Sequence, residues 1–203
     1  ISDWEIFARD IATREHKRAK ETRSQEDWDW AIRDYKTYLA IFPDSKYAGE
    51  ILLDLAESQF SAGLSVDAGK SYEKLAERTS NPTKRKEYLD SAIQAYITSI
   101  RNQSKLSKLE VAEVRAGLRD VGENYIKDNP RAKSAEDIRF NIAQTYYDER
   151  NFTRAVTHFK EFIKLYPGSS KVSVAANLTL DAYNQKEDYN NIVKEGKAIL
   201  ANP

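Results

Sequence analysis

The sequence predicts an all-α protein of about five helix-turn-helix units, with the third unit extended. Its five prolines are separated by 39, 48, 37 and 36 residues. Proline lacks the amide proton that a helix interior needs and clashes with the preceding turn, so prolines in a helical chain mark junctions. A nearly constant interval between junctions indicates a structural repeat. The prolines are Pro43, Pro82, Pro130, Pro167 and Pro203.

A second set of residues repeats in register with the prolines. From Ala143, steps of 12, 4, 3 and 5 residues lead to two aromatic residues and Pro167, and the same steps from Ala19 lead to Pro43. Related series begin at Ala56 and Leu180. Two helices cross closely at small side chains and bury large ones between them, which explains the fixed spacing. The two complete series are Ala143, Ala155, Phe159, Phe162, Pro167 and Ala19, Ala31, Tyr35, Tyr38, Pro43.

Ten helices in five pairs account for these positions. Apolar residues at helical spacing mark the second helix of each pair, and a serine followed by an acid three residues later favours a helix start. Such starts are Ser2 with Glu5, Ser107 with Glu110 and Ser134 with Asp137. The expected pairs are 3–22 with 26–42, 46–62 with 65–79, 82–101 with 108–128, 134–150 with 152–166, and 170–186 with 189–201.

The third unit contains 14 extra residues between its two helices. Ala92 and Ala143 are 51 residues apart, whereas the other repeats advance by 36 or 37. Fourteen residues are close to four helical turns, which would lengthen each arm by about 10 Å. We expect a protruding hairpin whose arms pack on each other, with a docking role as the functional alternative. The apolar residues expected between the arms are Ile97, Ile100, Leu106, Leu109, Val111 and Val114, and the polar tip is 102–105.

These residues resemble the tetratricopeptide repeat (TPR) family, whose unit has small, aromatic and proline residues at the same offsets. The resemblance covers nearly the whole chain. Leu52, Arg139 and Ala176 replace the family's early tryptophan, alanine replaces its glycine, and the period exceeds the usual ~34 residues. The resemblance implies a right-handed α-α superhelix, with one solenoid domain over residues 1–203.

Two junctions carry a further resemblance. The segments Phe42-Pro43-Asp44-Ser45 and Tyr166-Pro167-Gly168-Ser169 are similar to junctions in TPR proteins of the Gram-negative cell envelope, of the outer-membrane assembly lipoprotein and Tol-Pal-associated types. This similarity implies a periplasmic or cell-envelope location, with the cytoplasm as the alternative. Because the chain begins at Ile1, we expect it to be part of a longer protein, with any targeting signal or lipid anchor upstream.

The composition excludes several classes of protein. The chain has no cysteine, so it has neither disulfides nor thiolate metal sites. Charged residues are 32% and hydrophobic residues 40%, which is too apolar for disorder, and no run approaches the ~18 apolar residues of a membrane span. The 32 basic residues balance 32 acidic ones, so the basic surface that nucleic-acid binding needs is not indicated.

The sequence contains no catalytic, cofactor or metal motif. His16 and His158 are far apart and have no metal-ligand spacing, so we expect both to be solvated helix residues. Gly117 and Gly122 have the spacing of a phosphate loop, but Glu123 follows where lysine is required. We therefore expect a protein that is not an enzyme and needs no cofactor.

The first helix of each unit lines the concave face in the TPR family, and the resemblance implies that this face binds a peptide or protein partner. The residues there form an aromatic floor with amide and acidic edges, which suits a peptide with apolar anchors and a lysine or arginine. Alternatively, four of these side chains are part of the core between repeats: Leu53, Phe60, Phe140 and Tyr147. The candidates are Leu53, Glu57, Phe60, Tyr96, Phe140, Gln144, Tyr147, Asn177, Asp181 and Asn184.

The leading functional hypothesis is a non-catalytic scaffold for protein partners, in a bacterial cell-envelope complex. One alternative is an accessory region that recruits substrate for a larger enzyme. Another is a self-associating module, in which terminal repeats stack on a second copy to form a homo-oligomer.

Overall fold

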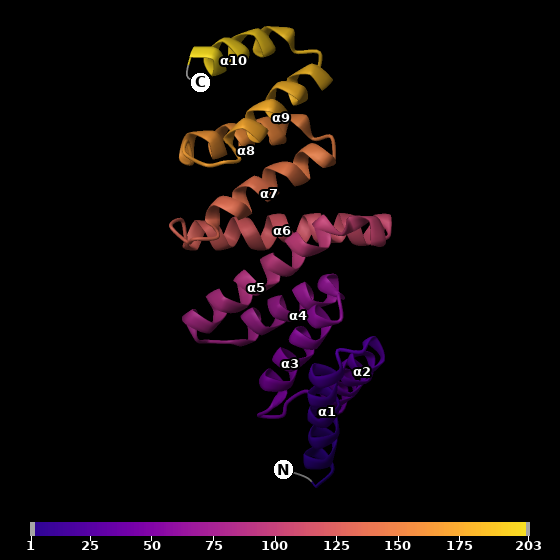
Figure 1. The fold of residues 1–203 in the computed structure, drawn as a ribbon. Helices are drawn as coiled ribbons and strands as arrows, with labels where there is room; N and C mark the ends of the chain where they lie inside the picture. Colours follow the sequence, from indigo (N-terminus) through magenta and orange to yellow (C-terminus); the bar gives the residue numbers. More distant parts are fainter. Residues whose placement is uncertain (1–2, 202–203) are drawn as a thin grey trace. The chain divides into compact units, whose positions relative to one another are not determined.

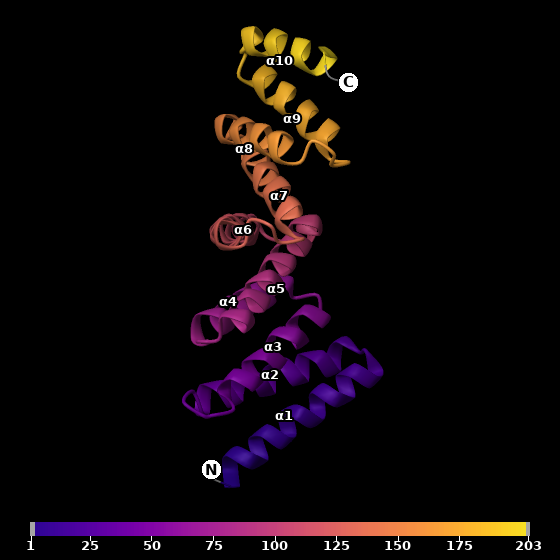
Figure 2. The same cartoon turned by 90° about the vertical axis from the view of Figure 1, so that its left-hand side faces the viewer.

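A computed structural model of the protein describes residues 3–201, with side chains up to residue 197. In this part of the chain there are ten α-helices, one 3-10 turn and no strand (Figures 1 and 2), which confirms the all-α prediction. Helix ends differ from the expected ones by at most two residues. The helices are α1 (Asp3–Thr22), α2 (Gln25–Ile41), α3 (Ala48–Ser61), α4 (Ser65–Arg78), α5 (Pro82–Arg101), α6 (Lys108–Asp128), α7 (Ala135–Asp148), α8 (Phe152–Leu165), α9 (Val172–Gln185) and α10 (Tyr189–Ala201), and the 3-10 turn is η1 (Gln103–Lys105).

The chain groups into two compact units, residues 1–117 and 118–203, with the boundary inside α6. The prediction of one continuous domain over residues 1–203 stays a prediction. Ser2 and Pro203, which belong to the predicted first cap and last junction, lie outside the described residues.

The core of the first unit is built from the repeated small and aromatic positions. Ala19 of α1 and Ala31 of α2 are fully buried where these helices cross, and Tyr35 and Tyr38 fill the space beside them. The next pair repeats this arrangement with Ala56 and other residues of α3 and α4. Small side chains let the helix axes approach, so the large ones between them lose their contact with water.

The core of the second unit follows the same pattern in α7 and α8. Ala143 and Ala155 are fully buried at the crossing, as are Phe159 and Phe162. Val156, Ala182 and neighbouring aromatic residues continue this core between α8 and α9. The residues that recur at fixed spacing in the sequence are therefore the ones that pack between the helices.

The turn after the first helix has a left-handed residue in every pair except the third. Gly63 has a φ of 79°, the matching residues Arg150 and Glu187 have φ values of 61° and 56°, and Arg23 after α1 has a φ of 55°. At the turn of Gly63, the amide of Leu64 donates to the carbonyl of Gln59 at 2.8 Å, which closes the end of α3. Glycine takes this conformation without strain, whereas side chains with a Cβ do not.

The aromatic-Pro-x-Ser junctions have a structural role in both units. Ser45 Oγ accepts a hydrogen bond from the amide of Tyr47 at 3.0 Å and lies 2.9 Å from the hydroxyl of Tyr38. Ser169 Oγ likewise accepts from the amide of Lys171 at 3.1 Å and donates to Glu136 at 2.6 Å. Each serine thus ties the chain entering the next helix to a helix of the preceding pair.

The third pair is extended, as predicted. The helices α5 and α6 have 20 and 21 residues, whereas α3, α4, α7, α8 and α9 have 14 each; of the first pair, α1 has 20 and α2 has 17. The start of α6 has the expected capping box: Ser107 donates to Glu110 from its amide and its hydroxyl, at 2.8 and 2.7 Å. The tip of the hairpin borders the α3–α4 turn, where Leu64, Val66 and Leu106 line a cavity of about 140 Å³.

Two details of the sequence prediction are wrong. Leu109 is 69% exposed, so it does not pack between the arms of the hairpin, although Ile97 and Val114 are buried. Ser134 makes no capping hydrogen bond with its side chain, because its hydroxyl points to that of Tyr125 at 3.5 Å.

No described helix combines the length and the apolar character that a membrane crossing requires.

Candidate protein-binding site

The first unit places two candidate residues at its surface. Glu57 is exposed and Phe60 is 42% exposed, whereas Leu53 of α3 is half-buried and packs against the core, as its alternative prediction had it. Tyr96 of α5 is only 3% exposed. Its side chain is therefore a core residue and does not face a partner.

Two glycines determine the position of Tyr96. A Cβ atom added to Gly69 of α4 would lie 2.5 Å from the Tyr96 ring, and one added to Gly117 of α6 would lie 2.9 Å from it. The ring is thus held between two helices that have no side chain at the contact. Burial raises the pKa of the Tyr96 hydroxyl, which donates a hydrogen bond to Glu73. This close approach assigns a packing function to Gly117, which is helical and not part of a phosphate loop.

Phe140 of α7 also belongs to the core, in the second unit. Its ring centre lies 5.9 Å from that of Phe159, in a tilted arrangement, and 5.4 Å from that of Phe162, in a T-shaped one. Such geometry is favourable for aromatic pairs inside a protein. The two most deeply buried of the predicted floor residues, Tyr96 and Phe140, are therefore structural.

The structure brings Tyr147 of α7 and Asp181 of α9 together. The Tyr147 hydroxyl donates a hydrogen bond to the Asp181 carboxylate, and this bond raises the pKa of Tyr147 to about 12. The ring of Tyr147 packs edge-on against Phe152, with centres 5.6 Å apart. Asp181 is half-buried, and its carboxylate is oriented by a tyrosine whose own ring is fixed by packing.

Amide side chains surround this pair. Asn177 and Asn184 lie four residues before and three residues after Asp181, so they share its face of α9, and both are exposed. Gln144 lies one turn before Tyr147 on α7 and is half-buried. We call these five residues, Gln144, Tyr147, Asn177, Asp181 and Asn184, the α7–α9 face.

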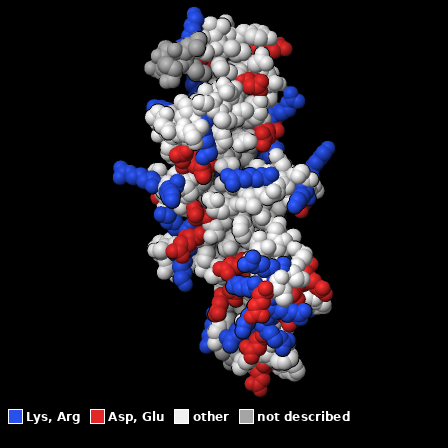
Figure 3. Space-filling view, viewed as in Figure 1, with Lys and Arg blue, Asp and Glu red and all other residues white. Residues whose placement is uncertain are grey.

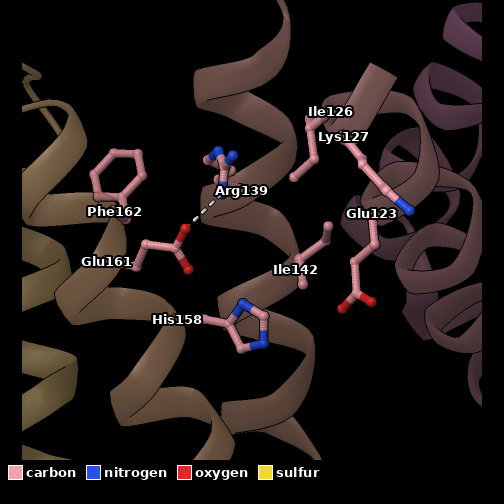
Figure 4. Close-up of a pocket in the computed structure, with 8 residues that line it drawn as sticks. All are labelled: Glu123, Ile126, Lys127, Arg139, Ile142, His158, Glu161 and Phe162. Atoms are coloured by element: carbon pink, nitrogen blue, oxygen red, sulfur yellow. Dashed lines mark hydrogen bonds and ion pairs between the residues drawn. The ribbon is translucent and has the colours of Figure 1, made fainter. Parts of the chain in front are cut away.

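Sequence reasoning missed a cavity in the second unit. It has a volume of about 310 Å³ and lies between α6 and α8, with α7 at its base (Figure 4). We call it the α6–α8 cavity. Its lining residues are Glu123, Ile126, Lys127, Arg139, Ile142, His158, Glu161 and Phe162.

Charged residues at this cavity form defined contacts. Arg139 Nη1 donates to Glu161 Oε1 at 3.0 Å. The ring of His158 stacks on that of Tyr146 with centres 4.9 Å apart, and burial lowers the pKa of His158. The hydroxyl of Tyr146 lies 3.4 Å from Glu123 Oε1. The one signal in the sequence was the arginine at position 139, where the other repeats have Leu52 and Ala176.

The prediction that both histidines are solvated is wrong. His16 is 5% exposed, and its Nδ1 lies 2.7 Å from the hydroxyl of Tyr35, while its Nε2 has no hydrogen-bond partner. Burial lowers the pKa of His16 to about 4. Helical periodicity places residue 16 on the buried side of α1, in line with Ala12 and Ala19, and this signal could have been used. Among the described residues, no three His, Cys, Asp or Glu side chains cluster as metal ligands would.

Comparison with known proteins identifies one repeat from its sequence and finds similar folds among solved structures. Residues 137–169 match the family model of the tetratricopeptide repeat. A search of curated proteins found no significant sequence match.

Solved structures with a similar fold cover most of the chain. A structure of MamA protein is 21% identical, aligns with 95% of this chain and 88% of its own, and has a TM-score of 0.53. A structure of MamA AMB-1 is 15% identical over the same shares, with a TM-score of 0.50. Repeats described as TPR-like in a kinesin light chain of Podosopora anserina are 13% identical over 93% of this chain and 92% of theirs, with a TM-score of 0.48.

The likeness to MamA concerns the fold alone, because the sequence identity is low. The matched repeat lies in α7 and α8, where the repeated alanines and phenylalanines form the core. Residues 137–169 thus match one tetratricopeptide repeat, and the solved structures show a similar fold for most of the chain.

Proposed function

We propose that this protein is a non-catalytic scaffold that binds a peptide or protein segment on the α7–α9 face. The main support is the half-buried carboxylate of Asp181, which the hydroxyl of Tyr147 orients and which lies between two exposed asparagines on α9. A carboxylate that is already oriented loses little freedom when it pairs with a basic side chain, which favours binding. The amides beside it can hydrogen-bond the main chain of a bound segment.

The partner expected from this chemistry has a lysine or arginine near an apolar residue. Asp181 supplies the charge, and the partly exposed ring of Tyr147 supplies apolar contact. On the protein face shown in Figure 3, acidic and basic side chains are interspersed, which suits a protein partner better than a nucleic acid.

Substitution of Asp181 tests this proposal. A partner is captured with the full chain, and its dissociation constant is measured for the wild type and for Asp181→Asn. We expect Asp181→Asn to weaken binding at least fivefold and to reduce its dependence on salt, because the attraction of a carboxylate to a cation is lost.

A matched control removes an exposed acid elsewhere. Glu26→Gln on α2 should leave the affinity unchanged, since Glu26 is exposed in the other unit. Far-ultraviolet circular dichroism should give the same helicity for all three proteins. Equal affinity of Asp181→Asn and the wild type would refute the assignment of this face.

We further propose that the scaffold acts in a bacterial cell-envelope complex, on the basis of the aromatic-Pro-x-Ser junctions. Fractionation of the producing cells with an antibody against the chain tests this location. Recovery with the periplasm or outer membrane would support it, and recovery with the cytoplasm would contradict it.

A further inference from the structure

We propose that the α6–α8 cavity is a second binding site, which takes one tryptophan or tyrosine side chain of a partner protein. The cavity of about 310 Å³ is at the lower end of the range of about 300–1,000 Å³ for ligand pockets. This volume suits a single large side chain. It belongs to a different face of α7 from Gln144 and Tyr147, so the inference goes beyond the function proposed above.

The floor of the cavity favours an apolar ring. Ile126 of α6, Ile142 of α7 and Phe162 of α8 line it, one from each helix (Figure 4). The side chains of these residues are buried, yet they border a space large enough for further apolar atoms. An aromatic side chain placed there would gain dispersion contacts and lose exposed surface.

The rim of the cavity favours an uncharged occupant. Lys127 and Arg139 carry two positive charges, and Glu123 and Glu161 carry two negative charges. A charged side chain would gain no net attraction from this balanced rim, although it would lose its hydration on entry.

The rim also favours an occupant with a hydrogen-bond donor. The carboxylates of Glu123 and Glu161 and the ring of His158 provide acceptors on both sides of α7 (Figure 4). The indole N–H of tryptophan and the hydroxyl of tyrosine are the donors that aromatic side chains can bring. The guanidinium of Arg139 can stack on the ring of either one.

Comparison of the repeats explains why a space exists here. Leu52 of α3 has the position in its repeat that Arg139 has in α7, and it is 3% exposed within the apolar core of the first unit. The side chain of Arg139 is instead paired with Glu161, and 21% of it remains exposed. Because Arg139 is held at the rim by Glu161, the second unit has a cavity of about 310 Å³ where the first unit has the apolar contacts of Leu52, and an external side chain can fill it.

A titration of the full chain with amino-acid amides tests this inference. The probe is N-acetyltryptophanamide, observed through the methyl resonances of Ile126 and Ile142 in a ¹³C-methyl-labelled protein. We expect saturable shifts at millimolar concentrations and nuclear Overhauser contacts from the indole ring to these methyl groups. N-acetylleucinamide should bind at least fivefold more weakly, and the corresponding amides of aspartate and lysine should cause no saturable shift.

Two tryptophan variants serve as a matched pair. Arg139→Trp should fill the cavity from within and weaken probe binding at least tenfold. Lys164→Trp, on the exposed side of α8, should retain wild-type binding. Asp181→Asn should retain it as well, so that a failure of this site is separated from a failure of the α7–α9 face.

Several results would overturn the inference. These are the lack of saturable shifts at Ile126 and Ile142, equal binding of the leucine and tryptophan amides, or full binding to a folded Arg139→Trp. Should Arg139→Trp not fold, the nuclear Overhauser contacts in the wild type decide the question by their presence or absence.

Discussion

The stability of the first unit should fall as the pH falls through the range in which His16 titrates. The imidazole is buried between Trp28 and Tyr35, with ring centres 5.7 and 5.6 Å away. Lys20 adds a nearby positive charge, and burial is the larger cause of the low pKa. The folded protein therefore disfavours the protonated form of His16.

The sign of the effect follows from proton binding. The pKa of His16 is about 4 in the folded state and about 6.5 in an unfolded chain, so the unfolded state binds more protons between these values. Stability is fully present above about pH 6.5 and is lost as the pH falls toward about 4. With these two pKa values, linkage gives a loss of about 2 kcal/mol between pH 7.5 and 5.

Asp54, near His16, contributes to the pH dependence of stability with the opposite sign. The Tyr35 hydroxyl lies 3.4 Å from Asp54 Oδ2, and burial raises the pKa of Asp54. A carboxyl group with a raised pKa is better protonated in the folded state, so acid stabilises the fold at this residue. A variant at His16 is needed to separate the two contributions.

Urea unfolding at pH 7.5 and pH 5 measures the effect. All three tryptophans, including Trp28, lie in the first unit, so their fluorescence reports its unfolding. His16→Gln keeps a partner for Tyr35 and cannot titrate. We expect the difference in unfolding free energy between the wild type and this variant to change by about 2 kcal/mol between the two pH values. A difference that stays constant within about 0.5 kcal/mol, or an NMR titration that gives His16 an ordinary pKa, would refute the reasoning.

Two further predictions concern glycine and use thermal or urea unfolding. Gly69→Ala should cost about 1–3 kcal/mol, because its Cβ would lie 2.5 Å from the ring of Tyr96. Gly49→Ala should instead leave the free energy of unfolding unchanged or raise it by about 0.5 kcal/mol, since no atom lies within 4 Å of a Cβ added there. Equal effects of Gly69→Ala and Gly49→Ala would contradict the close packing of Gly69 on Tyr96. Gly63→Ala should lower the free energy of unfolding by about 1 kcal/mol, because a φ of 79° strains a residue with a Cβ. Glu187→Gly should raise it by up to about 1 kcal/mol, because glycine relieves that strain at a φ of 56°. Destabilisation by both Gly63→Ala and Glu187→Gly would contradict the requirement for a left-handed backbone at these turns.

Much of the fold could be predicted because its signals are local and repeated. Proline positions mark junctions for a reason inside the backbone, and the spacing of Ala143, Ala155, Phe159 and Phe162 follows from the geometry of two crossing helices. The 14 extra residues likewise predicted the longer α5 and α6, since their helical pattern continues through the insertion. These features depend on neighbours along the chain or on one adjacent helix.

The candidate site was only partly predictable. Helical spacing put Asn177, Asp181 and Asn184 on one face of α9, but it could not separate Tyr147, whose hydroxyl reaches Asp181, from Phe140, which lies in the core. Both are aromatic residues of α7, and their different roles depend on which residues of α8 and α9 lie opposite. Periodicity indicates a face, and the burial of that face depends on the partner helix.

By itself, the sequence determined the helices, their pairing into repeats and the extended third hairpin, because each rests on backbone chemistry or on regular spacing. Only the tertiary structure decided that Tyr96 lies between Gly69 and Gly117, that His16 is buried beside Tyr35, and that Arg139 borders a cavity. Each of these depends on the distance between residues from different helices. Those distances are set when side chains of several helices compete for the same space, which no local pattern records.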